Sequence, residues 1–162
     1  MSSKTLPVTD IGKFYKQVKD FKSKIEIILN QYGHQDELIE LQKYYSKLKL
    51  AKKVNVRTPI ELLYEKGISK FAENILKRDE SFFLSKVTKV INGDEEIADI
   101  NPHDIVFIKQ INGVWSKLKP NIRDNIWDYI QVICLLAEKI VGGTILSTTR
   151  KMLAKEGKLE NK

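Results

Sequence analysis

The spacing of the apolar residues is the feature that most limits how this sequence can fold. Between residues 14 and 32 they recur at steps of three and four, which is the repeat of one face of an α-helix. Thr9 or Asp10 can cap this helix, and Gly33 can end it. A second helix is predicted from about residue 36 to 53, so the two form a helical hairpin. The apolar stripe of the first helix consists of Phe14, Val18, Phe21, Ile25, Ile28, Leu29 and Tyr32.

The same periodicity predicts helices up to about residue 143. Thr58-Pro59-Ile60-Glu61 has the pattern of a capping box, with proline at the first helical position. It predicts a third helix with a weak point at Gly67. Asp79 either continues this helix or caps a fourth one, and Asn101-Pro102 begins another. The helix predicted from residue 121 to 141 is apolar around most of its circumference, so it should be surrounded by the others.

One segment permits two interpretations. After the fourth helix, Asn92-Gly93 and the acidic residues 94–99 favour a surface loop. Alternatively, residues 87–91 and 96–100 form a β-hairpin, because Asn-Gly suits its tight turn.

We therefore predict an all-α protein, a single bundle of about six helices. A chain of 162 residues has room for one domain. Residues 1–8 should be flexible, residues 9–57 a basic hairpin, residues 58–143 the core helices, and residues 144–162 a basic and only partly ordered tail. The predicted aromatic anchors of the core are Trp115, Trp127, Phe71, Phe82 and Phe83.

The residues that usually carry chemistry are scarce. A single cysteine excludes an internal disulfide, and two histidines are too few for a structural zinc site. Phosphate-binding and dinucleotide-binding glycine motifs are missing from the sequence. Cys134 is predicted to be an inert thiol inside a helix, and Asp124 with Asp128 supplies too few ligands for a metal. We expect no catalytic residue, no metal and no cofactor, and hence no enzyme.

Positive charge gathers at the two ends of the chain. The net charge is +7, and residues 1–57 alone hold 12 basic and 6 acidic side chains. Each end of the chain can therefore attract an anionic partner. The most apolar stretch, residues 126–146, does not predict a membrane span, because it is interrupted by Asp128, Gln131, Glu138 and Lys139.

Two partner hypotheses follow. The leading one is a scaffold or interaction protein that docks on a protein partner or a second copy through the hairpin stripe, with Phe14, Val18, Phe21, Ile25 and Ile28. The alternative is nonspecific binding of nucleic acid by exposed basic groups. The residues assigned to that alternative are Lys16, Lys19, Lys47, Lys52, Lys53, Arg57, Arg150 and Lys151.

One further observation bears on the origin and the location of the protein and not on its activity. Trp115, a Lys-Pro turn and the run Ile126-Trp127-Asp128-Tyr129-Ile130-Gln131 resemble a segment of small helical proteins from nucleocytoplasmic large DNA viruses. The resemblance covers about 30 of the 162 residues. It implies a viral origin, with a place in the host cytoplasm, viral factory or virion, and supplies no site residue. Without it, the sequence favours the cytoplasm or nucleus.

Overall fold

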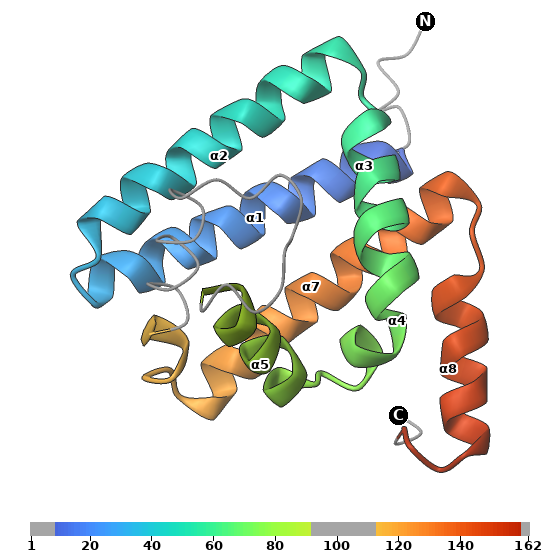
Figure 1. The fold of residues 1–162 in the computed structure, drawn as a ribbon. Coiled ribbons are helices and arrows are strands. Elements are labelled where there is room, and N and C mark those ends of the chain that lie inside the picture. The colour runs from blue at the N-terminus through green and yellow to red at the C-terminus, as the bar shows by residue number, and fades with distance from the viewer. Residues whose placement is uncertain (1–8, 92–112, 160–162) are drawn as a thin grey trace, which may run out of the picture.

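The computed structural model is a single compact all-α bundle, which confirms the predicted fold class (Figure 1). It describes residues 9–91 and 113–159, with only the backbone given for residues 86–91. No strand occurs in those ranges. The elements are α1 (Asp10–Gln31), α2 (Gln35–Val54), α3 (Thr58–Leu63), a π-helical turn η1 (Tyr64–Ile68), α4 (Ser69–Leu76), α5 (Glu80–Ile91), α7 (Pro120–Val141) and α8 (Ile145–Lys155).

Helix α7 lies at the centre of the bundle. It packs along α1 and also contacts α3, η1, α4 and α8 (Figure 1). Pro120 occupies its first turn, and Gly142 ends it with a positive φ of 74°. A left-handed residue after the last turn is the usual place for glycine. The prediction of a central helix ending at the glycine pair is therefore confirmed.

The third predicted helix is interrupted near its predicted weak point. Gly67 lies in the π-helical turn between α3 and α4, and the non-helical backbone angles of Phe71 kink the helix within α4. The predicted capping box is wrong, because Thr58 is itself the first residue of α3 and the capping position is occupied by Arg57, whose side chain makes no capping hydrogen bond. Asn55 instead satisfies the backbone at the start of the helix, because its Oδ1 accepts hydrogen bonds from the backbone N–H groups of Arg57 and Thr58 at 2.9 and 3.3 Å.

Helix α5 decides between the two interpretations of residues 87–91. The Oδ1 of Asp79 accepts a hydrogen bond from the backbone N–H of Phe82 at 3.2 Å and caps this helix. Of the two predictions for Asp79, the one in which it caps a fourth helix is therefore confirmed. Because α5 continues to Ile91, the β-hairpin alternative is wrong in its first strand. Its turn and second strand, and the helix predicted at Asn101-Pro102, lie outside the described residues.

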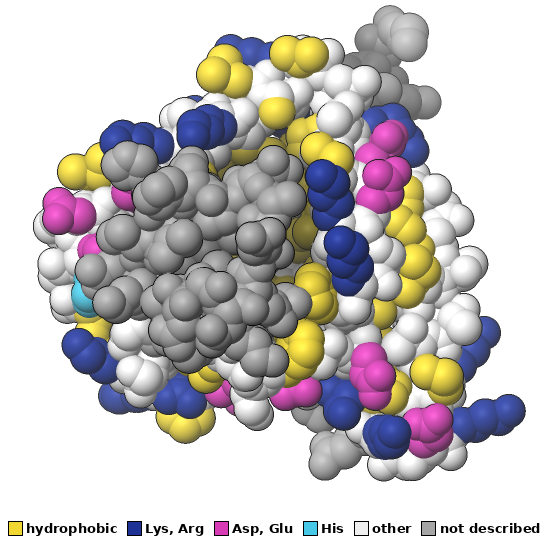
Figure 2. All heavy atoms as spheres, in the orientation of Figure 1, with side chains coloured by type: hydrophobic (Ala, Val, Ile, Leu, Met, Phe, Trp, Pro, Cys, Tyr) yellow, Lys and Arg dark blue, Asp and Glu magenta, His cyan; other side chains and the backbone are white. Residues whose placement is uncertain are grey.

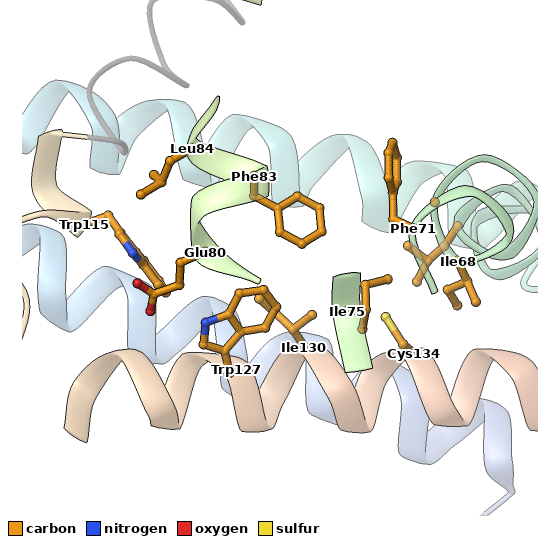
Figure 3. Close-up of a pocket in the computed structure, with 12 residues that line it drawn as sticks. Ile68, Phe71, Ile75, Glu80, Phe83, Leu84, Trp115, Trp127, Ile130 and Cys134 are labelled. Carbon is orange, nitrogen blue, oxygen red and sulfur yellow. The ribbon is translucent and has the colours of Figure 1, made fainter. Parts of the chain in front are cut away.

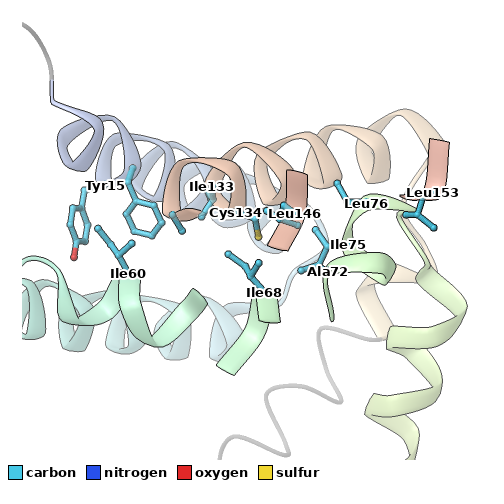
Figure 4. Close-up of a cluster of buried hydrophobic side chains, with 12 residues drawn as sticks. Tyr15, Ile60, Ile68, Ala72, Ile75, Leu76, Ile133, Cys134, Leu146 and Leu153 are labelled. Carbon is cyan, nitrogen blue, oxygen red and sulfur yellow. The ribbon is translucent and has the colours of Figure 1, made fainter. Parts of the chain in front are cut away.

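Two apolar clusters form the core. One lies where α1, α3, α4, α7 and α8 meet, and Figure 4 shows side chains from all of these helices converging there. The other fills the space between the end of α1, residues 114–118 and the start of α7. The fully buried large side chains are Leu29, Ile60, Ile68, Leu146 and Leu153.

The C-terminal segment has more structure than its sequence led us to expect. Residues 145–155 form α8, which packs against α4 and α7. Leu146 and Leu153 are both buried, and they lie seven residues apart on one side of the helix. The expected tail is therefore in large part an element of the bundle.

Candidate interaction surface

The apolar stripe of α1 belongs to the core rather than to an open surface. Phe14 and Ile28 are buried, and Val18, Phe21 and Ile25 pack against the two apolar clusters. Phe21 also stacks on Tyr129 of α7, with ring centroids 5.5 Å apart. The prediction that these five residues form the docking surface is corrected in this respect, because α7 of the same chain already covers the stripe.

Helix α2 offers the exposed side of the hairpin. It packs on α1 and α3, yet none of its own residues is buried. Three apolar side chains stay open to solvent on it, with Ile39 52%, Leu50 63% and Val54 88% exposed. Helical spacing puts them on one side together with three exposed lysines. We call this set the α2 face: Ile39, Lys43, Lys47, Leu50, Lys53 and Val54.

Basic side chains predominate over most of α2, although Lys43 of the α2 face is paired with Glu40 at 3.2 Å. Residues 41–57 contain six basic and no acidic side chains. Figure 2 shows blue basic and yellow apolar side chains beside one another along the upper edge of the molecule, where Figure 1 places α2. A predominantly basic surface of this kind attracts anionic groups.

Tyrosine rings hold several of these lysines in place. Lys52 Nζ lies 4.5 Å from the ring centre of Tyr15, and Lys22 and Lys49 both lie near the ring of Tyr45, at 4.9 and 5.3 Å. Lys47 lies 5.6 Å from the ring centre of Tyr44. Cation–π contacts of this kind are worth about 0.5–1 kcal/mol at exposed sites. They restrict the ammonium groups and place the tyrosine rings against lysines.

The predicted nucleic-acid residues do not form one surface. Lys16 and Lys19 are exposed on α1, and Lys47, Lys52 and Lys53 on α2. Arg57 is held by Glu61 at 3.3 Å and by the carbonyl of Ile140 at 3.2 Å. Arg150 and Lys151 lie on α8, on another side of the bundle from α2 (Figure 1). The basic ends of the sequence are thus separate in space.

The remaining chemical candidates have structural partners. The Nδ1 of His34 lies 3.3 Å from Glu37, and Asp128 is paired with Arg78, which also donates to Gln131 at 2.9 Å. Over residues 9–91 and 113–159 no group of three or more potential metal ligands occurs. His103 is outside those ranges.

Cys134 is a buried thiol on the central helix. Burial raises its pKa to about 12, because the apolar surroundings disfavour the thiolate. Since the thiolate is the reactive form, we expect Ellman's reagent at pH 8 to leave the native protein unmodified and to react at once after unfolding in guanidinium chloride. Rapid labelling of the native protein would show that the thiol is accessible and contradict this placement.

The sequence analysis did not identify the structural role of one buried carboxylate. Glu138 of α7 is buried, and its two oxygens accept from the backbone N–H groups of Leu146 at 2.6 Å and Ser147 at 3.2 Å. The hydroxyl of Tyr64 donates to the same carboxylate at 3.4 Å. Glu138 therefore caps α8 from another helix.

Gly143 makes this arrangement possible. A Cβ at this position would lie 2.0 Å from the hydroxyl oxygen of Tyr64, so only glycine lets the ring approach the turn between α7 and α8. The Gly-Gly pair thus has a second role besides ending α7.

Comparison of this chain with protein-family models, with curated proteins and with solved structures gives no match. The resemblance to viral helical proteins therefore stays a prediction. None of the described helices is long and apolar enough to cross a membrane.

Proposed function

We propose that the protein is a non-enzymatic interaction protein whose N-terminal hairpin docks on an acidic surface of a protein partner through the α2 face. The observation that carries the proposal is the exposure of Ile39, Leu50 and Val54 among lysines on a helix with no buried residue. Isolated exposed apolar residues are common, but Leu50 and Val54 lie one turn apart and Ile39 lies on the same side about three turns away, so apolar and basic side chains share one face of the helix.

The apolar residues favour a protein over a nucleic acid. Binding to a phosphate backbone depends on positive charge, and exposed leucine or valine side chains add nothing to it. Binding of single strands also requires open aromatic rings for base stacking. Here the rings of Tyr15 and Tyr45 are in contact with lysines. An acidic helix with apolar residues at intervals of three and four would match both the charge and the apolar side chains of the α2 face.

A second copy of the chain is a poor partner for this face. Two α2 faces brought together would place six lysines opposite one another, and like charges destabilise such a contact. The partner should therefore carry net negative charge where it meets α2.

The test is a titration of the full chain with an amphipathic peptide of leucine and glutamate, followed by amide chemical shifts. Random single-stranded DNA and random duplex DNA are titrated in the same buffer over a range of salt concentrations. We expect the peptide to bind more tightly than either DNA and to shift amides of α2. Tighter binding of DNA with a steep salt dependence would instead favour the nucleic-acid alternative.

Two sets of variants locate the surface. Replacing Lys43, Lys47 and Lys53 by glutamate should weaken peptide binding roughly tenfold or more by removing charge complementarity. The matched control replaces three lysines that are exposed on other elements by glutamate and should bind like the parent: Lys66 on η1, Lys70 on α4 and Lys155 on α8. Equal loss in both variants would mean that only net charge matters, and no loss in either would reject the α2 face.

A further inference from the structure

Helix α7 leaves one side open to solvent, although it is the central helix of the bundle. Trp127, Ile130 and Cys134 point from its inner side toward α4 and α5 (Figure 3), and α1 packs along another side. After Pro120, the exposed residues of α7 recur at steps of three and four, so they form one stripe along the helix. We call this stripe the α7 face: Asn121, Asp124, Asp128, Val132, Leu135 and Lys139. It shares no residue with the α2 face.

The middle of the α7 face is apolar, and charged residues lie on either side of it. Val132 and Leu135 are 40% and 41% exposed and lie one turn apart. Asp128 precedes Val132 by four residues, and Lys139 follows Leu135 by four. The side chains of Asp128 and Lys139 are 61% and 67% exposed. Exposed aliphatic residues are common on any surface, so the distinguishing feature is the equal spacing of opposite charges around this pair.

This spacing is self-complementary when two copies of α7 lie antiparallel. In a two-fold contact, residue i of one copy meets residue j of the other, and j meets i. With the axis between residues 133 and 134, Val132 faces Leu135 and Asp128 faces Lys139, and each pair occurs twice. A parallel arrangement would instead bring Asp128 against Asp128 and Lys139 against Lys139, where like charges repel.

We propose that the α7 face binds a second copy of this chain in the antiparallel arrangement. Within one copy, Asp128 is paired with Arg78, and Lys139 Nζ lies 3.5 Å from Asp10. Exposed ion pairs are worth little, so these contacts leave both groups able to meet the second copy. The carboxylates of Asp124 and Asp128 disfavour the acidic partner proposed for the α2 face. Because the contact is one helix wide, we expect a weak and reversible dimer with a Kd of roughly 10 µM or higher.

Sedimentation equilibrium of the full chain, at concentrations up to about 0.5 mM, measures the dimer directly. We expect the average mass to rise with concentration toward twice that of the monomer. Leu135→Glu should raise the dimer Kd at least tenfold, because it brings carboxylates into the apolar middle of the contact. The matched control is Leu62→Glu on α3, where Leu62 is 46% exposed, and it should associate like the parent. A parent that stays monomeric at every concentration would overturn the proposal, as would an equal effect of the two substitutions.

A charge exchange tests the antiparallel pairing. Asp128→Lys and Lys139→Glu each place like charges opposite one another in the symmetric dimer, so either variant alone should associate at least tenfold more weakly than the parent. In an equimolar mixture, the two substituted positions form one opposite-charge pair and the two unchanged positions form the other. The Kd should then return to within about threefold of the parent value. Circular dichroism confirms that both variants are folded before mixing, and a mixture that gains no association would contradict the antiparallel pairing.

A further comparison separates this contact from the α2 face. The variant that replaces Lys43, Lys47 and Lys53 by glutamate should lose peptide binding but dimerise like the parent. Leu135→Glu should show the opposite behaviour, with peptide binding retained and the dimer lost. Loss of the dimer in the lysine variant, with the dimer retained in Leu135→Glu, would place the contact on α2 and reject the α7 face.

Discussion

Phe14→Ala is expected to destabilise the protein by about 3–5 kcal/mol, which is the usual cost of removing a buried phenylalanine ring. Phe14 is 3% exposed and packs edge to face on Tyr15, with ring centroids 5.2 Å apart. Its loss leaves a cavity where α1 meets the main apolar cluster. Urea unfolding followed by circular dichroism measures the change, and the midpoint should fall with an unchanged slope.

The matched control for Phe14 lies on the same helix. Ile27 is 56% exposed, and Ile27→Ala should change the free energy of unfolding by less than about 0.5 kcal/mol. This comparison distinguishes a core residue from an interface residue. If Phe14→Ala unfolded like Ile27→Ala, and the protein instead lost an oligomeric state in light scattering, the stripe of α1 would be an interface after all.

The sequence was sufficient to predict the helices because their signals are local. The steps of three and four in α1, the all-round apolar character of α7 and the glycine at its end each depend on a few neighbouring residues. The central position of α7 also followed, because a helix apolar on every side has to be surrounded. The spacing of Leu146 and Leu153 was a further local signal, and it could have predicted α8.

The surface was harder to predict for a physical reason. A stripe such as Phe14 to Tyr32 has the same spacing whether it packs on its own chain or on a partner. Only the contacts between α1 and α7, which are about a hundred residues apart in the sequence, decide between these possibilities. Once the stripe is buried, the exposed residues of α2 become the better candidate, and their irregular mixture of lysine and aliphatic side chains gives no simple pattern.

The same limit explains why the capping of α8 was missed. The first turn of α8 has no cap of its own, since Thr144 makes no capping hydrogen bond with its side chain. Its acceptor is Glu138, eight residues before Leu146 and on a different helix. A carboxylate at the N-terminus of a helix satisfies free N–H groups and is favoured by the helix dipole. No rule based on neighbouring residues would assign Glu138 this role.

Glu138→Ala should therefore separate α8 from the bundle. The substitution leaves the N–H groups of Leu146 and Ser147 and the hydroxyl of Tyr64 without their acceptor. We expect a loss of about 3 kcal/mol or more in the free energy of unfolding, since hydrogen bonds to a buried charge are worth about 1.5–3 kcal/mol each. Amide hydrogen exchange should show the loss of protection first in α8, while the centre of α7 stays protected.

Two further variants decide whether the carboxylate acts as a cap. Glu138→Gln keeps one oxygen acceptor but replaces the other with a donor, so its stability should lie between that of the parent and that of Glu138→Ala. Glu156→Gln, at an exposed position after α8, should have no measurable effect. If Glu138→Ala lowered protection evenly over α7 and α8, the carboxylate would act on the whole bundle and not on the attachment of α8. Retention of α8 protection would mean that burial of Leu146 and Leu153 alone suffices to hold the helix.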